Sequence, residues 1–572
     1  MRCAALALVA LLASPRVEAQ ELASFEQIES TGPASPRSGR LLVIVEEGLR
    51  ARGGAELGER LGRFLGDLAG EGYRAVLFAA KLYRGQRHQD GRIVLALRRF
   101  LRECHASRAG LRGAILVGHF PDALLVRTVN WRKRGTPLKK YTKPMPYLRR
   151  VPEIVALRCD LVLADLDGEW ESRYCEERSR IPELYALFPG GVPTKGGTCL
   201  DLRSGTLGFE DYFHVADGRV RVDAASKHVE IDDAPRDFEC SAGDKERSNV
   251  IARPEIAISR IDARGVAWSP RPKLGTRPLL DSSGRPGSVA LDENEKLDPV
   301  RDLWRPDPEL ELRLLLEYFD RNHRYRTTER GAAFRPASIS WGLPSGFGVV
   351  KRAAGEWRDF SEPGYDVTKQ SDLVALIDWF RRPAVLRTLR AHSDARGTAW
   401  ARTGEQELHA ALGGPPLSWS VKDGRLVPSL AAAGRRGRAD FFLYRTLWEN
   451  RTLPDHPNLM IHTGCHALSP PGAEKLRYEQ PGYGARQNAE SLLFLTPALA
   501  IVARSKVFYD EPRGFCAALR EGKSFGAAWM RYFEIESRAR TWKEAGGDIG
   551  RKRSYFWSVI GDWTLRLRYG RR

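Results

Sequence analysis

Three short apolar runs, separated by two helical patterns, constrain the fold of this chain more than any other feature. The runs are Leu41–Val45, Tyr73–Phe78 and Ala114–Val117, each of a length typical of a buried strand. Between them, apolar residues recur at helical spacing over 57–68 and 94–104. Strands that alternate with helices are typical of a parallel sheet with crossover helices. This part of the chain therefore predicts an α/β fold.

The same alternation returns in the last third of the chain. A helical pattern over 485–495 separates two apolar runs, Leu459–His462 and Ala498–Val502. Helices are predicted over 512–537, and Tyr555–Ile560 predicts a last strand. We therefore expect two α/β halves with mainly parallel sheets and crossover helices, which either share one sheet or lie side by side.

The first residues have the pattern of a secretory signal. Arg2 gives a positive start, residues 4–13 are apolar, and small residues precede a cleavage point after Ala19. The apolar run is too short to span a bilayer, and no later run reaches about 18 uninterrupted apolar residues. We expect no transmembrane segment and a secreted or periplasmic protein.

Composition divides the rest of the chain. Pro, Ser and Gly are frequent before the first strand, and Pro, Gly and Asp are frequent after the strand predicted at 254–261. We therefore expect a signal peptide (1–19), a flexible lead (20–39), an N-terminal α/β subdomain with cysteine-rich, acidic loops (40–264), an insertion or linker (265–308) and a C-terminal α/β subdomain (309–572).

The chain is strongly basic, with a formal net charge of +19 at pH 7. Such a charge favours contact with anionic surfaces, so an anionic envelope surface is one expected partner. The basic residues are spread along the chain, and no common nucleic-acid-binding motif is present. Together with the predicted export, this excludes nucleic acid as the expected partner.

Eight cysteines bear on the oxidation state of the protein. Removal of Cys3 with the signal leaves an odd number, which in an oxidising compartment predicts one thiol outside any disulfide. Five cysteines lie between 104 and 240, where disulfides could staple long loops. Cys465 is far from this group and is the first candidate for the unbridged thiol, although Cys516 is equally isolated.

Cys465 lies in the segment MIHTGCHALSP, directly after a predicted strand. Functional groups of parallel α/β sheets lie at the carboxyl ends of the strands, so the thiol would face a crevice. Gly464 would let a substrate carbonyl approach the backbone amides that form an oxyanion hole. A half-buried structural cysteine is the alternative.

A cysteine nucleophile needs an imidazole that accepts the thiol proton. His392 follows an apolar run and precedes a polar turn that contains glycine, so it could lie at a strand end like Cys465. His466 could reach the thiol locally. His462, Cys465 and His466 together also allow a zinc or copper site, although the spacing lacks a paired set of four ligands.

Acidic residues alternate in a turn that contains glycine. Asp165, Asp167 and Glu169 could present oxygen ligands to Ca²⁺. An acid-rich surface turn is the alternative.

Several motifs resemble the gingipain-like family of cysteine peptidases, which has a caspase-related fold. The resemblance covers roughly 40–570, and its segments occur in the family's order. They are ILVGH (115–119), LADLDGEW (163–170), PEIAISRI (254–261), His392 followed by Trp400, Cys465, ALAIVARSKV (498–507), GFCAALREGKSFGAAW (514–529) and GDWTLRL (561–567).

This resemblance implies a secreted cysteine endopeptidase that acts on proteins or peptides through a thioacyl intermediate. Cys465 would be the nucleophile, His392 would transfer the proton, and backbone amides near Ser393 and Cys465 would stabilise the oxyanion. The C-terminal subdomain would be the caspase-like catalytic part. No cofactor would be required for the chemistry, and the resemblance adds support for structural Ca²⁺ at the acidic turn.

The chain departs from the family in three respects. Ala391 and Ser393 replace the glycines that normally flank the histidine, Trp563 replaces a proline, and His466 directly follows the nucleophile. Loss of the glycines could narrow the oxyanion hole. The alternative function is therefore a catalytically degenerate caspase-like module that binds an anionic envelope surface or a protein partner.

Overall fold

The computed structural model describes most of both α/β halves. The described residues are 22–32, 39–82, 91–107, 110–129, 153–175, 212–214, 220–223, 228–231, 253–270, 304–328, 335–341, 366–368, 372–391, 393–394, 397–399, 405–413, 419–422, 425–428, 438–468, 488–505, 512–537, 555 and 557–568.

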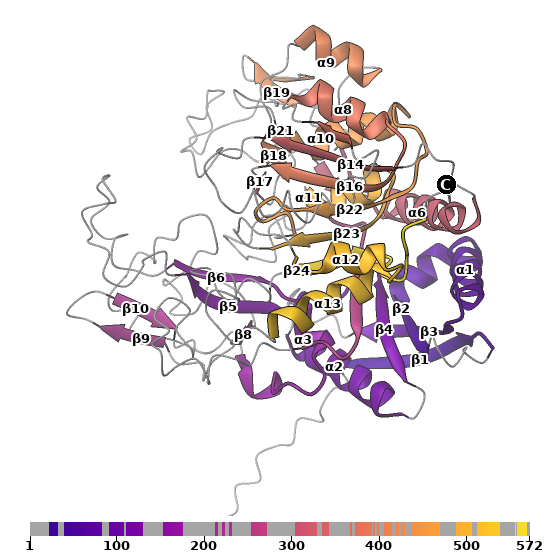
Figure 1. Ribbon diagram of the computed structural model, residues 1–572, viewed down its shortest axis with the longest axis vertical. Coiled ribbons are helices and arrows are strands. Elements are labelled where there is room, and N and C mark those ends of the chain that lie inside the picture. Colours follow the sequence, from indigo (N-terminus) through magenta and orange to yellow (C-terminus); the bar gives the residue numbers. More distant parts are fainter. Residues whose placement is uncertain are drawn as a thin grey trace, which may run out of the picture.

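One sheet of 11 strands runs through the molecule (Figure 1). Its order is β1 (Ala23–Ser30), β3 (Arg74–Leu82), β2 (Arg40–Glu46), β4 (Leu111–Val117), β11 (Ala257–Ile261), β24 (Trp557–Gly561), β23 (Ala498–Arg504), β22 (Asn458–His462), β16 (Ala384–Ala391), β14 (Arg335–Trp341) and β15 (Asp366–Thr368). The two predicted halves therefore share one sheet.

The sheet consists of two parallel blocks that run in opposite directions. Strands β3, β2, β4, β11 and β24 are parallel to one another and form the first block. Strands β23, β22, β16, β14 and β15 form the second. The blocks meet where β24 pairs antiparallel with β23, so the carboxyl ends of their strands lie at opposite edges of the sheet. The prediction of a mainly parallel α/β fold is confirmed.

Helices connect the strands within each block. Strands such as β22 and β23 are buried along their whole length, as expected for parallel strands covered on both faces. The helices α1 and α6 pack against each other in Figure 1. The helices are α1 (Glu47–Gly70), α2 (Gly91–Ala106), α3 (Leu161–Ala164), α6 (Pro308–Thr327), α8 (Leu373–Arg381), α9 (Glu405–Leu412), α10 (Phe441–Glu449), α11 (Asn488–Leu495), α12 (Phe515–Arg520) and α13 (Phe525–Ser537).

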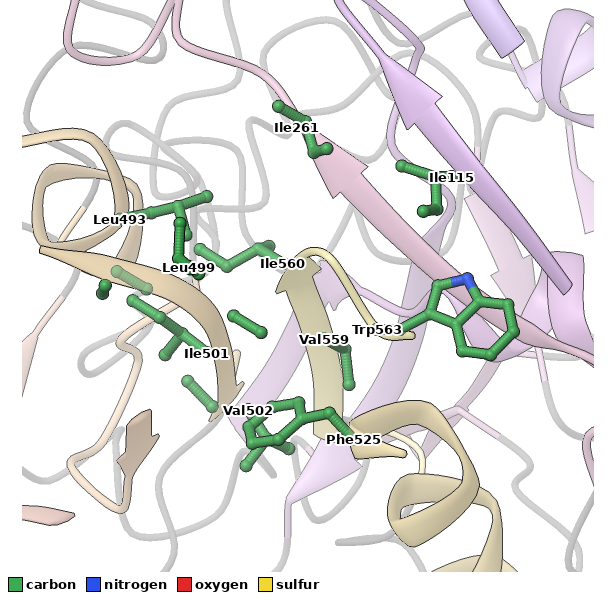
Figure 2. Packing of buried hydrophobic residues seen from close by; sticks show 14 of the residues in the cluster. Ile115, Ile261, Leu493, Leu499, Ile501, Val502, Phe525, Val559, Ile560 and Trp563 are labelled. Atoms are coloured by element: carbon green, nitrogen blue, oxygen red, sulfur yellow. The ribbon is translucent and has the colours of Figure 1, made fainter. Parts of the chain in front are cut away.

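Figure 2 shows the apolar core where the two blocks join. Val559 and Ile560 of β24 lie between side chains of both blocks. Trp563, which stands where the resembled family has proline, is buried and donates from Nε1 to the Ala114 carbonyl at 3.2 Å. Glycines at 113 and 526 leave room for its ring, because a Cβ at either position would overlap it. The tryptophan is thus a packed component of the junction.

Several smaller sheets are separate from the main one. They are β6 (Glu153–Arg158), β5 (Leu124–Val129), β8 (Tyr212–His214) and β7 (Tyr174–Cys175); β9 (Val220–Asp223) with β10 (His228–Ile231); β12 (Trp268–Pro270) with β13 (Trp304–Pro306); β17 (Ser393–Asp394), β18 (Gly397–Ala399) and β21 (Arg438–Asp440); and β19 (Trp419–Lys422) with β20 (Arg425–Pro428). Pairing of β12 with β13 joins the two ends of the expected insertion.

Two expectations from the sequence need correction. Residues 23–30, expected in a flexible lead, form the edge strand β1, which pairs antiparallel with β3. The second expectation, disulfide staples among the cysteines between 104 and 240, does not hold for Cys104 and Cys159, whose side chains are described and form no disulfide. Cys465, expected to be outside any disulfide, and Cys516 are also unbridged. Cys104 is instead buried on α2, and the Cys159 thiol donates to the Tyr555 carbonyl at 3.0 Å.

Membrane insertion through a helix finds no support in the described residues, where no helix is both long and apolar enough to span a bilayer.

Candidate active site

The carboxyl ends of β16 and β22 form the candidate site. These strands are parallel neighbours in register, with Leu389 opposite His462. The chain that leaves β22 stays attached to β16, because the Thr463 N–H donates to the Leu389 carbonyl at 2.9 Å. The turn at 463–466 and the start of β17 therefore lie at one edge of the sheet.

Cys465 differs from the other described cysteines in its exposure. Cys104, Cys159 and Cys516 are buried, whereas Cys465 is partly exposed. A thiol must be accessible to attack a substrate, so exposure selects Cys465. The odd number of cysteines does not select it, because the other three are also thiols.

The loop after β16 contacts the turn that carries Cys465. The Ser393 hydroxyl donates to the Cys465 carbonyl at 2.6 Å. Gly464 permits this approach, because a Cβ there would overlap Ser393 Oγ and would lie 3.0 Å from the Ala391 carbonyl oxygen. The residues on both sides of His392 thus lie next to the turn that carries Cys465, while His392 itself lies outside the described residues.

His462 is the last residue of β22 and is completely buried. Its Nδ1 accepts a hydrogen bond from the Gly464 N–H at 3.0 Å, and its Nε2 lies 3.5 Å from Thr398 Oγ1. Burial, with the positive charge of Arg504 in addition, lowers the pKa of His462 to about 3. The imidazole is therefore neutral at physiological pH.

His466 follows the cysteine in a left-handed conformation, with φ of 53°. Such a backbone is strained for a residue other than glycine and is often found at functional sites. Its Nδ1 lies 3.2 Å from the Ser505 carbonyl oxygen, at the end of β23. The side chain therefore ties the turn to the neighbouring strand.

The alternative of a zinc or copper site formed by His462, Cys465 and His466 gains no support. Among the side chains that the structure describes, only one group of three or more potential ligands is close enough to hold a metal ion, and it contains none of the three. His462 Nδ1 already accepts a hydrogen bond, so its lone pair is occupied.

That group of ligands is acidic and lies in the first block. Asp165, Asp167 and Glu255 place carboxylate oxygens within 4.8 Å of one another. Glu169, expected from the sequence to belong to this set, is exposed and outside it. Glu255, the second residue of the PEIAISRI segment, was missed as a candidate ligand. Its Oε2 accepts from the Leu166 N–H at 2.6 Å and therefore lies next to the acidic turn.

The buried Arg98 side chain fixes the acidic turn. Its guanidinium donates to the carbonyls of Val162 at 2.8 Å and Gly168 at 2.6 Å, and also to those of Asp165 and Leu166. The Asp165 carboxylate accepts from Trp170 Nε1 at 2.7 Å.

Burial raises the pKa of Asp165 to about 7. The Trp170 hydrogen bond acts in the opposite direction, and the negative charge of Glu255 raises the pKa further. A carboxylate group of this kind can bind a divalent cation, which would neutralise the mutual repulsion. The oxygen ligands suit Ca²⁺ better than a transition metal.

No protein-family model and no curated protein matches this chain. Three solved structures are similar over most of it. The Arg-specific cysteine proteinase gingipain R has a TM-score of 0.41 and 11% identity, covering 94% of this chain and 80% of its own. A complex of Porphyromonas gingivalis RgpB pro- and mature domains has a TM-score of 0.42 and 12% identity, with coverage of 92% and 80%. A structure described only as a protease has a TM-score of 0.43 and 11% identity, covering 94% of this chain and 80% of its own. At these values the similarities assign neither an activity nor a site residue to this chain.

Proposed function

We propose that this chain is a cysteine endopeptidase with Cys465 as nucleophile and His392 as its base. The observation that carries the proposal is the contact between two loops at one sheet edge. Ser393 bonds the Cys465 carbonyl, so the residue next to His392 touches the residue that bears the thiol. The partial exposure of Cys465 and the order of the sequence motifs support the same assignment.

In the proposed reaction, Cys465 Sγ attacks the carbonyl carbon of a peptide bond while His392 accepts the thiol proton. Backbone N–H groups of Ser393 and Cys465 stabilise the oxyanion. The intermediate collapses to a thioester as His392 returns the proton to the leaving amine. Water, deprotonated by His392, then cleaves the thioester and restores the thiol.

The burial and contacts of His462 make it unsuitable as the base, which favours His392. His462 is buried and its Nδ1 accepts the Gly464 N–H. His466 contacts the Ser505 carbonyl through Nδ1. Both rings thus have backbone contacts at this turn.

The test is iodoacetamide labelling of the native protein with peptide mapping, beside cleavage of a mixed peptide pool. We expect selective alkylation of Cys465 and loss of cleavage in Cys465→Ala. The matched control is Cys516→Ala, which removes the other isolated cysteine, buried on α12, and retains cleavage. An unreactive Cys465 without cleavage of any peptide contradicts the proposal and favours the alternative of a non-catalytic module that binds anionic surfaces through its charge of +19.

We further propose Ca²⁺ for the acidic cluster and a location outside the cytoplasm, directed by residues 1–19. Ligand geometry supports the first, since Asp165, Asp167 and Glu255 converge on one point. Asp165→Asn is expected to remove any rise of the melting temperature caused by Ca²⁺. Glu169→Gln, at an exposed position outside the trio, is the matched control and keeps it. A calcium effect that survives Asp165→Asn contradicts the site.

A further inference from the structure

A completely buried, neutral histidine lies three residues before the candidate nucleophile, and the proposed reaction does not use it. We propose that His462 is a positioning residue: its Nδ1 holds the Gly464 N–H and thereby orients the turn that presents Cys465. This inference rests on the proposed role of Cys465 and adds a residue that acts through it.

The hydrogen bond defines the state of the ring. Because the Gly464 N–H donates to Nδ1 at 3.0 Å, Nδ1 carries no proton and the neutral ring is protonated at Nε2. Nε2 points toward Thr398 Oγ1 at 3.5 Å, and Thr398 Oγ1 also lies 3.4 Å from Nδ2 of Asn488. Three elements, β22, β18 and α11, therefore meet around one imidazole.

The environment keeps the acceptor available. Among the side chains that the structure describes, the charged group that acts on the ring is Arg504 at the end of β23; Asn488 is neutral, and its hydrogen bond opposes the lowering of the His462 pKa. A protonated imidazole would be a donor at both nitrogens and could not accept the Gly464 N–H. Burial beside a guanidinium disfavours that form, so the bond persists over the pH range in which a peptidase acts.

The bond acts at the residue where the turn has the least freedom. Gly464 lies against Ser393 Oγ, His462 Cε1 and the Ala391 carbonyl, so even a methyl group does not fit. On either side, the Thr463 N–H is held by the Leu389 carbonyl and the Cys465 carbonyl by Ser393. The Thr463–Gly464 peptide unit is held on both sides, because its N–H donates to His462 Nδ1 and its carbonyl accepts from Arg504.

A pair of substitutions separates the acceptor from the volume of the ring. His462→Asn retains an acceptor close to the position of Nδ1, whereas His462→Leu fills the space without one. Met460→Leu is the matched control, since Met460 is equally buried on β22 and makes no such bond. All three proteins are compared by thermal unfolding before kinetics are measured.

Two kinetic readouts apply to the full-length proteins. Loss of the bond leaves a buried N–H without its acceptor and displaces the thiol. In His462→Leu, both the rate at which iodoacetamide alkylates Cys465 and kcat should therefore fall about tenfold. We expect KM to stay within about threefold, because the restraint acts on the nucleophile and not on substrate binding. His462→Asn should recover most of the rate, and the acidic limb of the pH–rate profile should not move.

Different results contradict different claims. If wild type cleaves no peptide, the endopeptidase proposal fails, whereas the order of the alkylation rates still tests His462. Equal rates for wild type and His462→Leu, or no recovery in His462→Asn, overturn the positioning role. If the acidic limb of the pH–rate profile were lost in the His462 variants, His462 would be the base, and the positioning role would be overturned as well.

A measurement without catalysis covers the case in which His462→Leu does not fold. Hydrogen exchange of the Gly464 amide reports the bond directly in wild type and in Thr398→Val, which removes the Oγ1 contacts with the ring and with Asn488 but retains the imidazole. Strong protection in wild type that falls in Thr398→Val supports the inference. A Gly464 amide that exchanges in wild type as fast as an exposed loop contradicts it.

Discussion

The two parallel blocks have the same architecture but use their carboxyl edges differently. In the first block, Glu46 at the end of β2 caps α1 by accepting from the Gly48 and Leu49 N–H groups. Arg260 at the end of β11 pairs with Asp160 at 2.8 Å and donates to two backbone carbonyls. Polar groups at this edge are bound in structural contacts.

In the second block, the corresponding edge presents a partly exposed thiol. Its neighbours, His462 and Ser393, bond the backbone around Cys465, and the Cys465 residue is partly exposed. Both edges belong to one sheet, so they differ in the side chains at their strand ends and not in architecture. Three predictions test this contrast, taken from the largest expected effect to the smallest.

The largest effect is expected where the two blocks are joined by charge. Arg158 contacts Asp122 of the first block at 2.8 Å and Glu490 on α11 of the second at 2.7 Å, and all three are buried. Arg158→Ala leaves the buried Glu490 without its cation and leaves Asp122 with Arg260 at 3.8 Å, which should cost about 3–5 kcal/mol in the free energy of unfolding.

Chemical denaturation measures this cost, with Arg531→Ala as control. Arg531 pairs with Glu534 at the surface, so its loss should cost about 1 kcal/mol or less. If Arg158→Ala unfolds in two separate transitions, the blocks are independent units joined by this residue. A stability equal to that of the control would show that the ion pairs do not hold the blocks together.

The next effect compares one glycine at each edge. A Cβ at Gly464 would overlap Ser393 Oγ, so Gly464→Ala should displace the nucleophile turn and lower kcat about 100-fold. Gly118, after β4, has φ of 94° and a Cβ there would lie 2.8 Å from Leu49. Gly118→Ala should cost roughly 1–3 kcal/mol of stability through backbone strain.

The kcat and the thermal stability of Gly464→Ala and Gly118→Ala, each compared with wild type, test this prediction. We expect Gly118→Ala to keep its kcat per folded molecule, because that edge contributes no group to the reaction. An equal loss of kcat in both variants would mean that the two edges are functionally coupled.

The sequence predicted the buried strands well, because short continuous apolar runs such as those of β2, β22 and β23 are typical of strands covered on both faces. β1 was missed because it is an edge strand with mostly exposed, polar residues. The opposite direction of the blocks follows from the pairing of β24 with β23, which no local pattern encodes.

The candidate site was predicted in part. The position of Cys465 after a strand was sufficient to single it out, but its bond to Ser393 depends on the adjacency of β16 and β22. Glu255 joins the acidic cluster from a distant strand, so spacing within the turn could not reveal it. Disulfides were expected from the number of cysteines, which carries no information on burial.

The smallest effect concerns a buried carboxyl near the edge of the first block. Glu311 on α6 pairs with Arg52 at 2.6 Å. Burial raises its pKa to about 7, the charges of Asp262 and Glu46 add to this, and Arg264 and Arg52 oppose it. Between pH 5 and 7 the folded chain therefore keeps a proton that the unfolded chain, with a pKa of 4.5, has mostly lost.

The free energy of unfolding should consequently fall as pH rises from 5 to 7, by about 2 kcal/mol from this group. Glu311→Gln should remove this slope, whereas Glu309→Gln, at an exposed position of the same helix, should keep it. Denaturation at several pH values measures both. Because Glu311 pairs with Arg52 on α1, which follows β2 of the first block, kcat corrected for the folded fraction should be the same in both variants. A change in kcat with Glu311→Gln would show that charge at the structural edge reaches Cys465, and the functional separation of the two edges would have to be abandoned.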